Sequence, residues 1–158
     1  MTRTKTLASL GILMLMASGL WFLASLPSIP TIPLLGMENM LLKDGTQLSH
    51  QERMNFSHDH FVYTRTWDID DNRAFFQISG KVLFDGRKHG SMTVDDRSTS
   101  NELHANANKF NQDTFFNLTQ VLAKGSTLNI KILKSDDKGV CIYLYLARAV
   151  HCFGAIPD

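Results

Sequence analysis

The sequence predicts an α+β protein, in which an N-terminal transmembrane helix is followed by a small antiparallel-sheet domain with one packed helix. Three observations lead to this prediction. A long uncharged stretch lies near the N-terminus, alternating apolar and polar residues mark strands further on, and one later segment has apolar residues at helical spacing. Of the 158 residues, about 120 remain after the first 36, which is enough for one domain with its own core.

The uncharged stretch runs from Leu7 to Leu26. At a rise of about 1.5 Å per residue, a helix of this length spans a hydrocarbon core of about 30 Å. Arg3 and Lys5 precede it, whereas the first acidic residue is Glu38. The positive-inside rule therefore places the tail, residues 1–6, in the cytoplasm and the C-terminal domain on the other side of the membrane.

A cleaved signal peptide is the alternative interpretation of this segment. The small residues Ala17, Ser18 and Gly19 resemble a cleavage site, but the apolar region of a signal peptide is usually shorter, at about 7–15 residues. Three prolines within residues 27–36 end the helix, because proline lacks the backbone N–H and disfavours helix in the residue before it. We therefore expect a stiff linker over 27–36 and a globular domain over 37–158.

The first part of the globular domain, Met37 to Asn55, has a weak pattern, with a turn expected at Asp44-Gly45 and a short helix from Ser49. His60 to Asp68 is rich in aromatic and β-branched residues, with Phe61, Tyr63 and Trp67 on one face, which predicts a strand. Ala74 to Phe84 alternates, with Phe76, Ile78, Val82 and Phe84 on one side, which predicts a half-buried strand.

Asp85-Gly86 follows this strand and is a strong hairpin signal, so His89 to Arg97 is the expected return strand, with Met92 and Val94 inward. A helix is expected over Gln112 to Lys124, because four apolar residues recur at helical spacing and Gly125 suits a C-terminal cap. Those four residues are Phe115, Leu118, Val121 and Leu122. Two final strands are expected at Thr127 to Lys134 and Val140 to Arg148, joined at residues 136–139.

Cys141 and Cys152 are the only cysteines. On the exported side of a membrane the compartment is oxidising, which permits a disulfide. A strand that turns near Arg148 would bring the two residues within bridging distance. The alternative is a pair of buried free thiols, and the spacing is not that of a redox enzyme. We expect the disulfide.

All six histidines lie in the globular domain, and histidine titrates near the pH range of an external compartment. His58 and His60 are two residues apart, so on a strand their imidazoles share a face. They are candidates for sensing pH. Two imidazoles could also approach one metal ion, but the sequence supplies no certain third ligand, with His50 only a guess, and we predict no metal site.

No catalytic constellation is evident in the sequence. It contains no G-x-S-x-G, no H-E-x-x-H and no glycine-rich phosphate loop. Without Arg3 and Lys5, the rest of the chain has 14 basic residues against 15 acidic ones, a net charge of −1. A nucleic-acid-binding face would need a basic surplus. We therefore expect no enzyme activity, no cofactor and no nucleic-acid partner.

The segment Ile78 to Gly86 and the strand-plus-cysteine ending, Ile142 to Cys152, follow a basic tail, one helix and a proline break. In this layout the chain resembles the FidL-like inner-membrane proteins of enteric bacteria, and it is similar in plan to the ToxS and PsaF/MyfF accessory proteins. The resemblance covers the whole chain as a layout and rests on no specific motif. It implies a single-pass protein of the bacterial inner membrane with a periplasmic domain. That domain would bind and modulate a membrane-bound winged-helix transcription regulator.

Two other functions remain open from the sequence. One is a periplasmic immunity or inhibitor protein that neutralises a toxin. The other is a small module that senses an amphipathic ligand such as a bile salt. For the leading function, contact with another protein, the expected surfaces are apolar patches or free strand edges of the two hairpins, around Phe76 to Val94 and Thr127 to Arg148.

Overall fold

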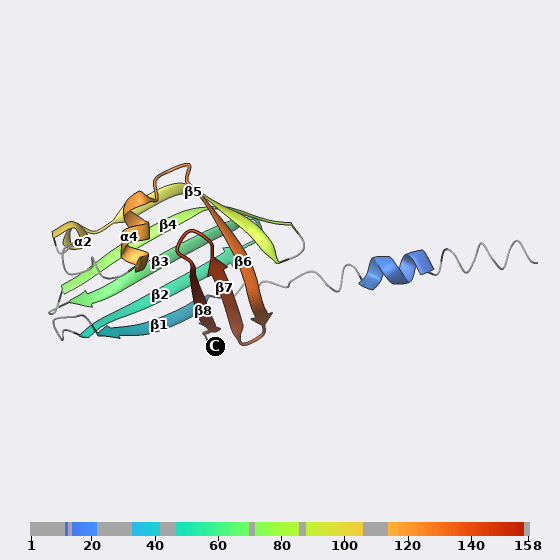
Figure 1. Cartoon of the computed structure of the whole chain (residues 1–158), viewed down its shortest axis with the longest axis horizontal. Helices are drawn as coiled ribbons and strands as arrows, with labels where there is room; N and C mark the ends of the chain where they lie inside the picture. Colours follow the sequence, from blue (N-terminus) through green and yellow to red (C-terminus); the bar gives the residue numbers. More distant parts are fainter. Residues whose placement is uncertain are drawn as a thin grey trace, which may run out of the picture.

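The computed structural model describes residues 12, 14–21, 33–41, 47–69, 72–85, 88–105 and 114–156. Eight antiparallel strands dominate this part of the chain (Figure 1). They are β1 (Leu34–Leu41), β2 (Gln47–Ser57), β3 (His60–Ile69), β4 (Asn72–Phe84), β5 (His89–Thr99), β6 (Thr127–Asp136), β7 (Gly139–Leu144) and β8 (Ala149–Ala155). Two short helices, α2 (Asn101–Ala105) and α4 (Thr114–Val121), lie between β5 and β6.

The strands form a closed barrel in which each strand pairs with the next and β8 returns to β1. The predicted antiparallel sheet is confirmed, but the α+β class is wrong, because the domain is mostly β and the sheet has closed on itself. Two register shifts support this closure, one in the β4–β5 pair at Ser79/Gly80 and one in the β6–β7 pair at Ile132/Lys134. Such bulges bend a strand and increase its twist.

Two glycines are required by the close approach of neighbouring backbone. At the β4–β5 bulge, a Cβ atom on Gly80 would collide with the carbonyl oxygen of Thr93. At the start of β7, a Cβ atom on Gly139 would collide with the carbonyl oxygen of Phe153 on β8. Larger residues at either position would force the strands apart.

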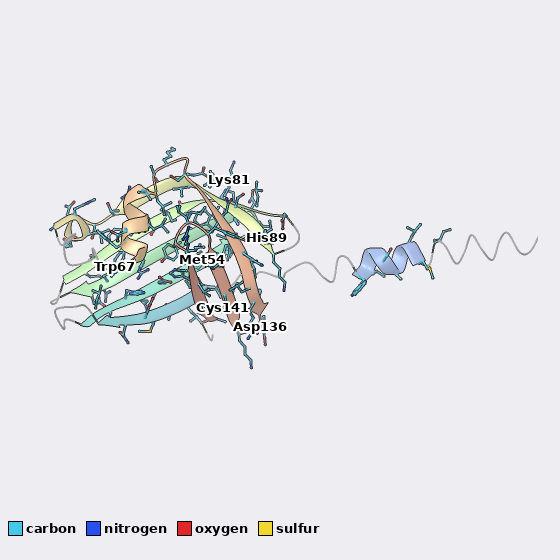
Figure 2. All side chains as sticks on the ribbon, viewed as in Figure 1. Met54, Trp67, Lys81, His89, Asp136 and Cys141 are labelled. Carbon is cyan, nitrogen blue, oxygen red and sulfur yellow. A yellow bond between two sulfur atoms is a disulfide. The ribbon has the colours of Figure 1, made fainter. Side chains whose placement is uncertain are left out.

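Alternation along the strands fills the barrel interior with apolar side chains. Met54 and Trp67 lie inside, whereas Lys81 and His89 are exposed (Figure 2). The predicted inward faces of the third, fourth and fifth strands are confirmed, with Phe84 only half-buried. The core of the described residues also includes Leu34, Leu48, Phe56, Phe61, Tyr63, Ala74, Phe76, Ile78, Val82, Met92, Val94, Leu103, Leu128, Ile130, Ile132, Val140, Ile142, Leu144 and Phe153.

The expectation for the segment before Asn55 was wrong. In place of a short helix from Ser49, the chain forms β2, which pairs with β1 from Leu34↔Met54 to Leu41↔Gln47. The inward positions of β2 alternate as a strand requires, but two of them are the polar residues His50 and Glu52. Polar residues at core positions hide the period of two from a hydrophobicity pattern. The expected turn at Asp44-Gly45 lies outside the described residues.

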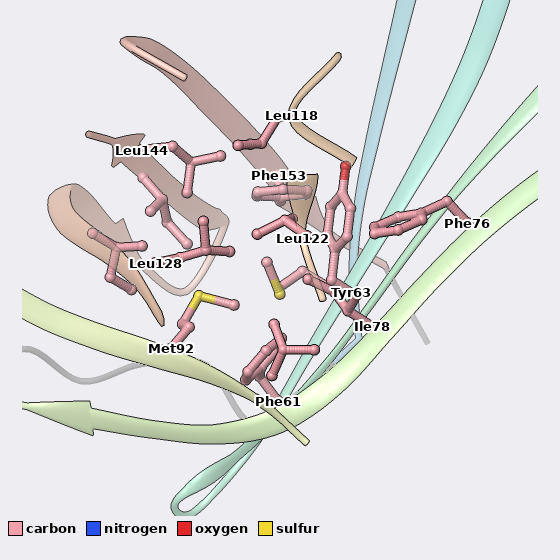
Figure 3. Packing of buried hydrophobic residues seen from close by; sticks show 14 of the residues in the cluster. Phe61, Tyr63, Phe76, Ile78, Met92, Leu118, Leu122, Leu128, Leu144 and Phe153 are labelled. Carbon is pink, nitrogen blue, oxygen red and sulfur yellow. The ribbon is translucent and has the colours of Figure 1, made fainter. Parts of the chain in front are cut away.

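The predicted helix exists but is shorter, Thr114–Val121 rather than 112–124. Leu118 and Leu122 are buried as expected, and Figure 3 shows both among side chains from β3, β4 and β8. Val121 was predicted wrongly, since it is 67% exposed, and Phe116 is buried instead with its ring edge-to-face to Trp67 at 6.3 Å. Thus α4 contributes to the barrel core from between β5 and β6.

The last predicted strand, Val140 to Arg148, ends earlier, at Leu144, and a further strand that was not predicted follows it. Residues after Leu144 form a turn in which Arg148 has a positive φ of 51°, and β8 begins at Ala149. The β6–β7 turn is where the sequence placed it, and Asp136 accepts the backbone N–H groups of Lys138 and Gly139 at 3.0 and 3.1 Å. The β4–β5 hairpin is confirmed, although four residues connect the strands and two of them, 86 and 87, lie outside the described part.

Residue 12 and residues 14–21 are helical, within the predicted membrane span. The other residues of 7–26, the tail 1–6 and most of the linker lie outside the described residues. Among the helices that are described, none has both the length and the hydrophobicity to cross a membrane. The transmembrane helix and the domain boundaries before residue 33 therefore stay predictions.

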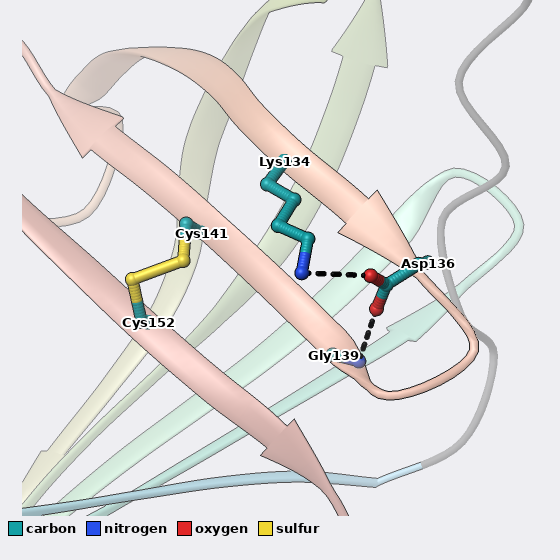
Figure 4. The surroundings of a disulfide bond; sticks show 5 residues. All are labelled: Lys134, Asp136, Gly139, Cys141 and Cys152. Atoms are coloured by element: carbon teal, nitrogen blue, oxygen red, sulfur yellow. Dashed lines mark hydrogen bonds and ion pairs between the residues drawn. A yellow bond between two sulfur atoms is a disulfide. The ribbon is translucent and has the colours of Figure 1, made fainter.

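The predicted disulfide joins Cys141 and Cys152, which face each other directly across the β7–β8 pair with their Cα atoms 4.0 Å apart (Figure 4). The bridge lies on the outer face of the barrel and fixes the last strand to its neighbour. No cysteine is left free. A disulfide also agrees, weakly, with an oxidising compartment.

We expect replacement of both cysteines by serine to lower the free energy of unfolding by about 2–3 kcal/mol, since the bridge closes a loop of about ten residues in the unfolded chain. Urea unfolding of the oxidised protein and of the double variant measures the difference. Reduction of the wild type should reproduce it. Equal stability of all three forms would contradict a structural role for the bridge.

Candidate functional site at the β1–β8 seam

The two histidines predicted to sense pH lie apart from the buried part of the barrel. His58 occupies the β2–β3 turn with a φ of 54°, and His60 begins β3. Both are exposed, and the His60 Nδ1 atom is 2.6 Å from the Asp59 carboxylate. His50, the guessed third ligand, lies near the other end of β2. Among the described residues, no three His, Cys, Asp or Glu side chains are grouped to hold a metal.

A different set of charged side chains meets inside the barrel, which we call the seam cluster: Glu38, His50, Glu52, Arg65 and His151. Four strands contribute to it, β1, β2, β3 and β8. Glu52, Arg65 and His50 are almost completely buried, whereas the side chain of Glu38 is 60% exposed at the rim. The cluster lies where the last strand of the barrel returns to the first.

Glu52 is the centre of the seam cluster. Its Oε1 atom is 2.9 Å from an Arg65 guanidinium nitrogen, directly across the β2–β3 pair, where Glu52 lies opposite Arg65. Its Oε2 atom accepts from His151 Nδ1 at 3.2 Å. One carboxylate therefore joins β2 to β3 and to β8. Such pairs persist inside a core because each charge has a charged or hydrogen-bonded partner.

His50 links the buried guanidinium to the rim. Arg65 donates to His50 Nδ1 at 3.2 Å, and the opposite ring nitrogen, Nε2, is 3.1 Å from Glu38 Oε2. Since arginine is a donor only, Nδ1 acts as the acceptor and Nε2 carries the ring proton. His50 is therefore neutral in this arrangement. Arg65 also lies over the Trp67 ring, with its guanidinium carbon 5.2 Å from the ring centre.

Contacts within the cluster shift the pKa of Glu52 and of the neighbouring Tyr63. Burial raises the pKa of Glu52, but the hydrogen bond from His151 and the positive charge of Arg65 outweigh it, and the pKa is lowered from the usual 4.5. Burial and the negative charge of Glu52 raise the pKa of Tyr63 well above 10.0. At neutral pH the carboxylate is thus ionised and the phenol is neutral.

A cavity of about 170 Å³ opens onto the cluster between β1 and β8. One wall is Gly36 to Glu38, the other is Val150 to Cys152, and Glu52 completes the lining. The carboxylates of Glu38 and Glu52 both line this cavity, whereas Arg65 is not among its lining residues. The cavity can therefore receive a small cationic or hydrogen-bond-donating group.

Apolar side chains lie on the outer surface beside this cavity. Tyr145, Leu146 and Val150, from the β7–β8 hairpin, are exposed, and Met37 of β1 is 73% exposed across the cavity from Val150. The rings of Tyr143 and Tyr145 meet edge-to-face with centroids 5.1 Å apart. We call Met37, Tyr143, Tyr145, Leu146 and Val150 the seam patch.

Sequence reasoning found the disulfide but missed the seam cluster. Nothing local distinguishes Glu52 or Arg65 from surface charges until the register of β2 and β3 is known. One signal was available for Arg65, because it lies midway between Tyr63 and Trp67 and therefore on the predicted inward face of that strand.

Comparison with known proteins adds no identification. No protein-family model matches the sequence, and no curated protein matches it significantly. The resemblance to FidL-like proteins therefore stays a prediction. The fold defines a class only: an antiparallel eight-stranded barrel with a packed interior and a buried ionic cluster at its seam.

We expect the variant Arg65→Met to lose about 3–5 kcal/mol of unfolding free energy, because it leaves the Glu52 carboxylate buried without its guanidinium. The double variant Arg65→Met/Glu52→Gln should be more stable than Arg65→Met alone. Arg73→Met is the matched control, since the Arg73–Asp68 pair is exposed and should contribute little. Urea unfolding compares all four proteins. A loss in Arg65→Met no larger than in Arg73→Met would contradict the argument.

The lowered pKa of Glu52 predicts a pH dependence. Its stabilising contribution is fully present above about pH 4.5, where the unfolded carboxyl is ionised, and is lost as the pH falls through the lower pKa of the folded state. The stability difference between wild type and Glu52→Gln should therefore shrink in acid. Urea unfolding of both proteins between about pH 7 and pH 3 tests this. A stability difference that stays constant over that range would show that the ionised Glu52 carboxylate does not cause the pH dependence.

Proposed function

We propose that this chain is a membrane-anchored accessory protein whose barrel binds and modulates another protein outside the cytoplasm, with no catalytic turnover. The partner that we propose is the periplasmic domain of a membrane-bound winged-helix transcription regulator of the bacterial inner membrane. The anchor would hold both proteins in one membrane, and a tether raises the effective concentration of a partner. Even a weak contact between the two domains would then be well populated.

The seam patch is the observation that supports binding. Large apolar side chains on the outer surface of a β-barrel gain nothing from the core, and a contiguous exposed apolar patch commonly marks a protein–protein interface. Tyrosine is also enriched in such interfaces because one side chain offers both a large apolar ring and a hydroxyl group. Here Met37 and Val150 line one cavity, Tyr143 lies opposite Val150 across the β7–β8 pair, and Tyr145, next to Leu146, contacts the Tyr143 ring.

The contact surface differs from the one expected from the sequence. Both strands of the β4–β5 hairpin pair with further neighbours, β3 and β6, so this hairpin does not present a whole free edge. The second expected region, Thr127 to Arg148, contains part of the seam patch. The proposal therefore moves from the two predicted hairpins to β7, β8 and β1.

The test is co-expression of the full chain with the product of its adjacent gene, followed by measurement of that product's abundance and co-purification. We expect Leu146→Arg to reduce co-purification, because it places a charge in the apolar contact without touching the core. Val121→Arg is the matched control, since Val121 is also apolar and 67% exposed but lies on α4, which contributes no residue to the seam patch.

Loss of co-purification in both variants would indicate a general surface effect and contradict the assignment of the seam patch. An unchanged partner level and no complex with the wild-type protein would overturn the proposed function. Neutralisation of an adjacent toxin in the same assay would instead support an immunity protein.

A further inference from the structure

The barrel is only partly closed between β1 and β8. These strands pair at two positions, Leu34↔Ala155 and Leu35↔Gly154, whereas β1 pairs with β2 along its whole length. In Figure 1 the start of β1 lies near the end of β8, and from there the two strands run in different directions. Among the described strands, none pairs with the β8-facing edge of β1 after Leu35.

The backbone pattern shows which groups this edge offers. The carbonyl of Pro33 accepts the N–H of Ile156 at 3.3 Å, so residue 33 directs its polar group toward β8. In an antiparallel ladder every second residue does the same. Leu35 lies within the paired positions, and Met37 and Asn39 follow beyond them. The N–H and C=O groups of Met37 and Asn39 therefore point outward from the unpaired edge of β1.

Glu38 lies between these two residues, and its side chain points to the opposite side of the strand plane from theirs, toward the cavity. A strand added beside β1 would place the residue opposite Glu38 on the same inward side. That residue would meet the 60% exposed Glu38 carboxylate, the ionised Glu52 carboxylate and His151. A basic side chain complements this lining, whereas an acidic one would be repelled.

We infer that the seam binds an extended segment of the partner protein, which pairs with β1 at Met37 and Asn39 and places one arginine or lysine side chain against Glu38. This inference rests on the proposed function and specifies its partner. Main-chain hydrogen bonds to the edge would supply affinity, and the acidic cavity would supply specificity. Met37 and Val150, on the outer face, would contact the outward side chains of the added strand.

The test uses the full chain in detergent micelles and a capped seven-residue peptide of alternating threonine and valine with one central arginine. A second peptide has citrulline, which keeps the shape and loses the charge, in place of arginine. Titration calorimetry measures both affinities. We expect the arginine peptide to bind about fivefold more tightly, as for a partly exposed charge pair. The variant Glu38→Gln should remove this preference, and Asp137→Asn, an exposed acid on the β6–β7 turn, should keep it.

A second pair of variants tests the backbone contact. Met37→Pro removes the N–H group offered at the edge, and we expect it to abolish binding of both peptides. Met37→Ala keeps the N–H and should bind, with some loss of apolar contact. Thermal unfolding of each variant confirms that the barrel is intact. If Met37→Pro does not fold, the same comparison is made with Asn39→Pro and Asn39→Ala.

Equal affinity for arginine and citrulline peptides would overturn the charge assignment, and wild-type binding by a folded proline variant would overturn strand addition. Failure of wild type to bind either peptide would overturn the inference as a whole. The proposed function is judged separately, by co-purification of the intact partner with wild type and Leu146→Arg. A complex that survives both Glu38→Gln and Met37→Pro would leave the function standing and remove this inference.

Discussion

The carboxylate of Glu52 faces the guanidinium of Arg65 on β3 and accepts a hydrogen bond from His151 on β8. These contacts matter for the whole barrel because β8 has only two paired positions with β1. Beyond them, the link between His151 and Glu52 connects the last strand to β2, underneath the seam. Burial makes the link costly to break, since an unpaired charge would remain in the core.

The same cluster also separates the apolar core from the cavity between β1 and β8, because charged side chains rather than core residues line that cavity. Apolar side chains fill the interior from Phe56 to Val140, and the ionic groups gather at one side, where the strands diverge. His50 contacts Arg65 through one ring nitrogen and lies close to Glu38 with the other, and Glu38 is partly exposed to solvent. The side chains therefore change gradually from apolar ones in the buried core, through buried charged ones, to the partly exposed Glu38 at the surface.

Closure also depends on local features far from the cluster. The bulges at Ser79/Gly80 and Ile132/Lys134 bend their strands, and the Cys141–Cys152 bridge holds β8 to β7. Because β8 is fixed on one side by covalent and ladder bonds, its other edge can part from β1 while the domain remains folded. A rigid, partly unpaired edge is suited to binding, since little ordering is needed when a strand is added.

The sequence by itself determined strands β3 to β7 in outline, the β4–β5 hairpin, the β6–β7 turn and the cysteine pairing. These features depend on neighbours in the chain, such as the alternation of Phe76 and Ile78 or the short loop between Cys141 and Cys152. The helix was also predicted, but its buried face was wrong at Val121. Phe116 is buried instead, where its ring packs against Trp67 of β3.

Only the tertiary structure decided that the sheet closes, that β2 is a strand and that Glu52, Arg65 and His151 meet. Residues 52 and 151 are 99 positions apart, and no local pattern encodes their contact. The inward charges of β2 looked like surface residues because their partners come from other strands. Register and closure, which are set by long-range pairing, convert these apparently ordinary polar residues into a buried cluster beside an open strand edge.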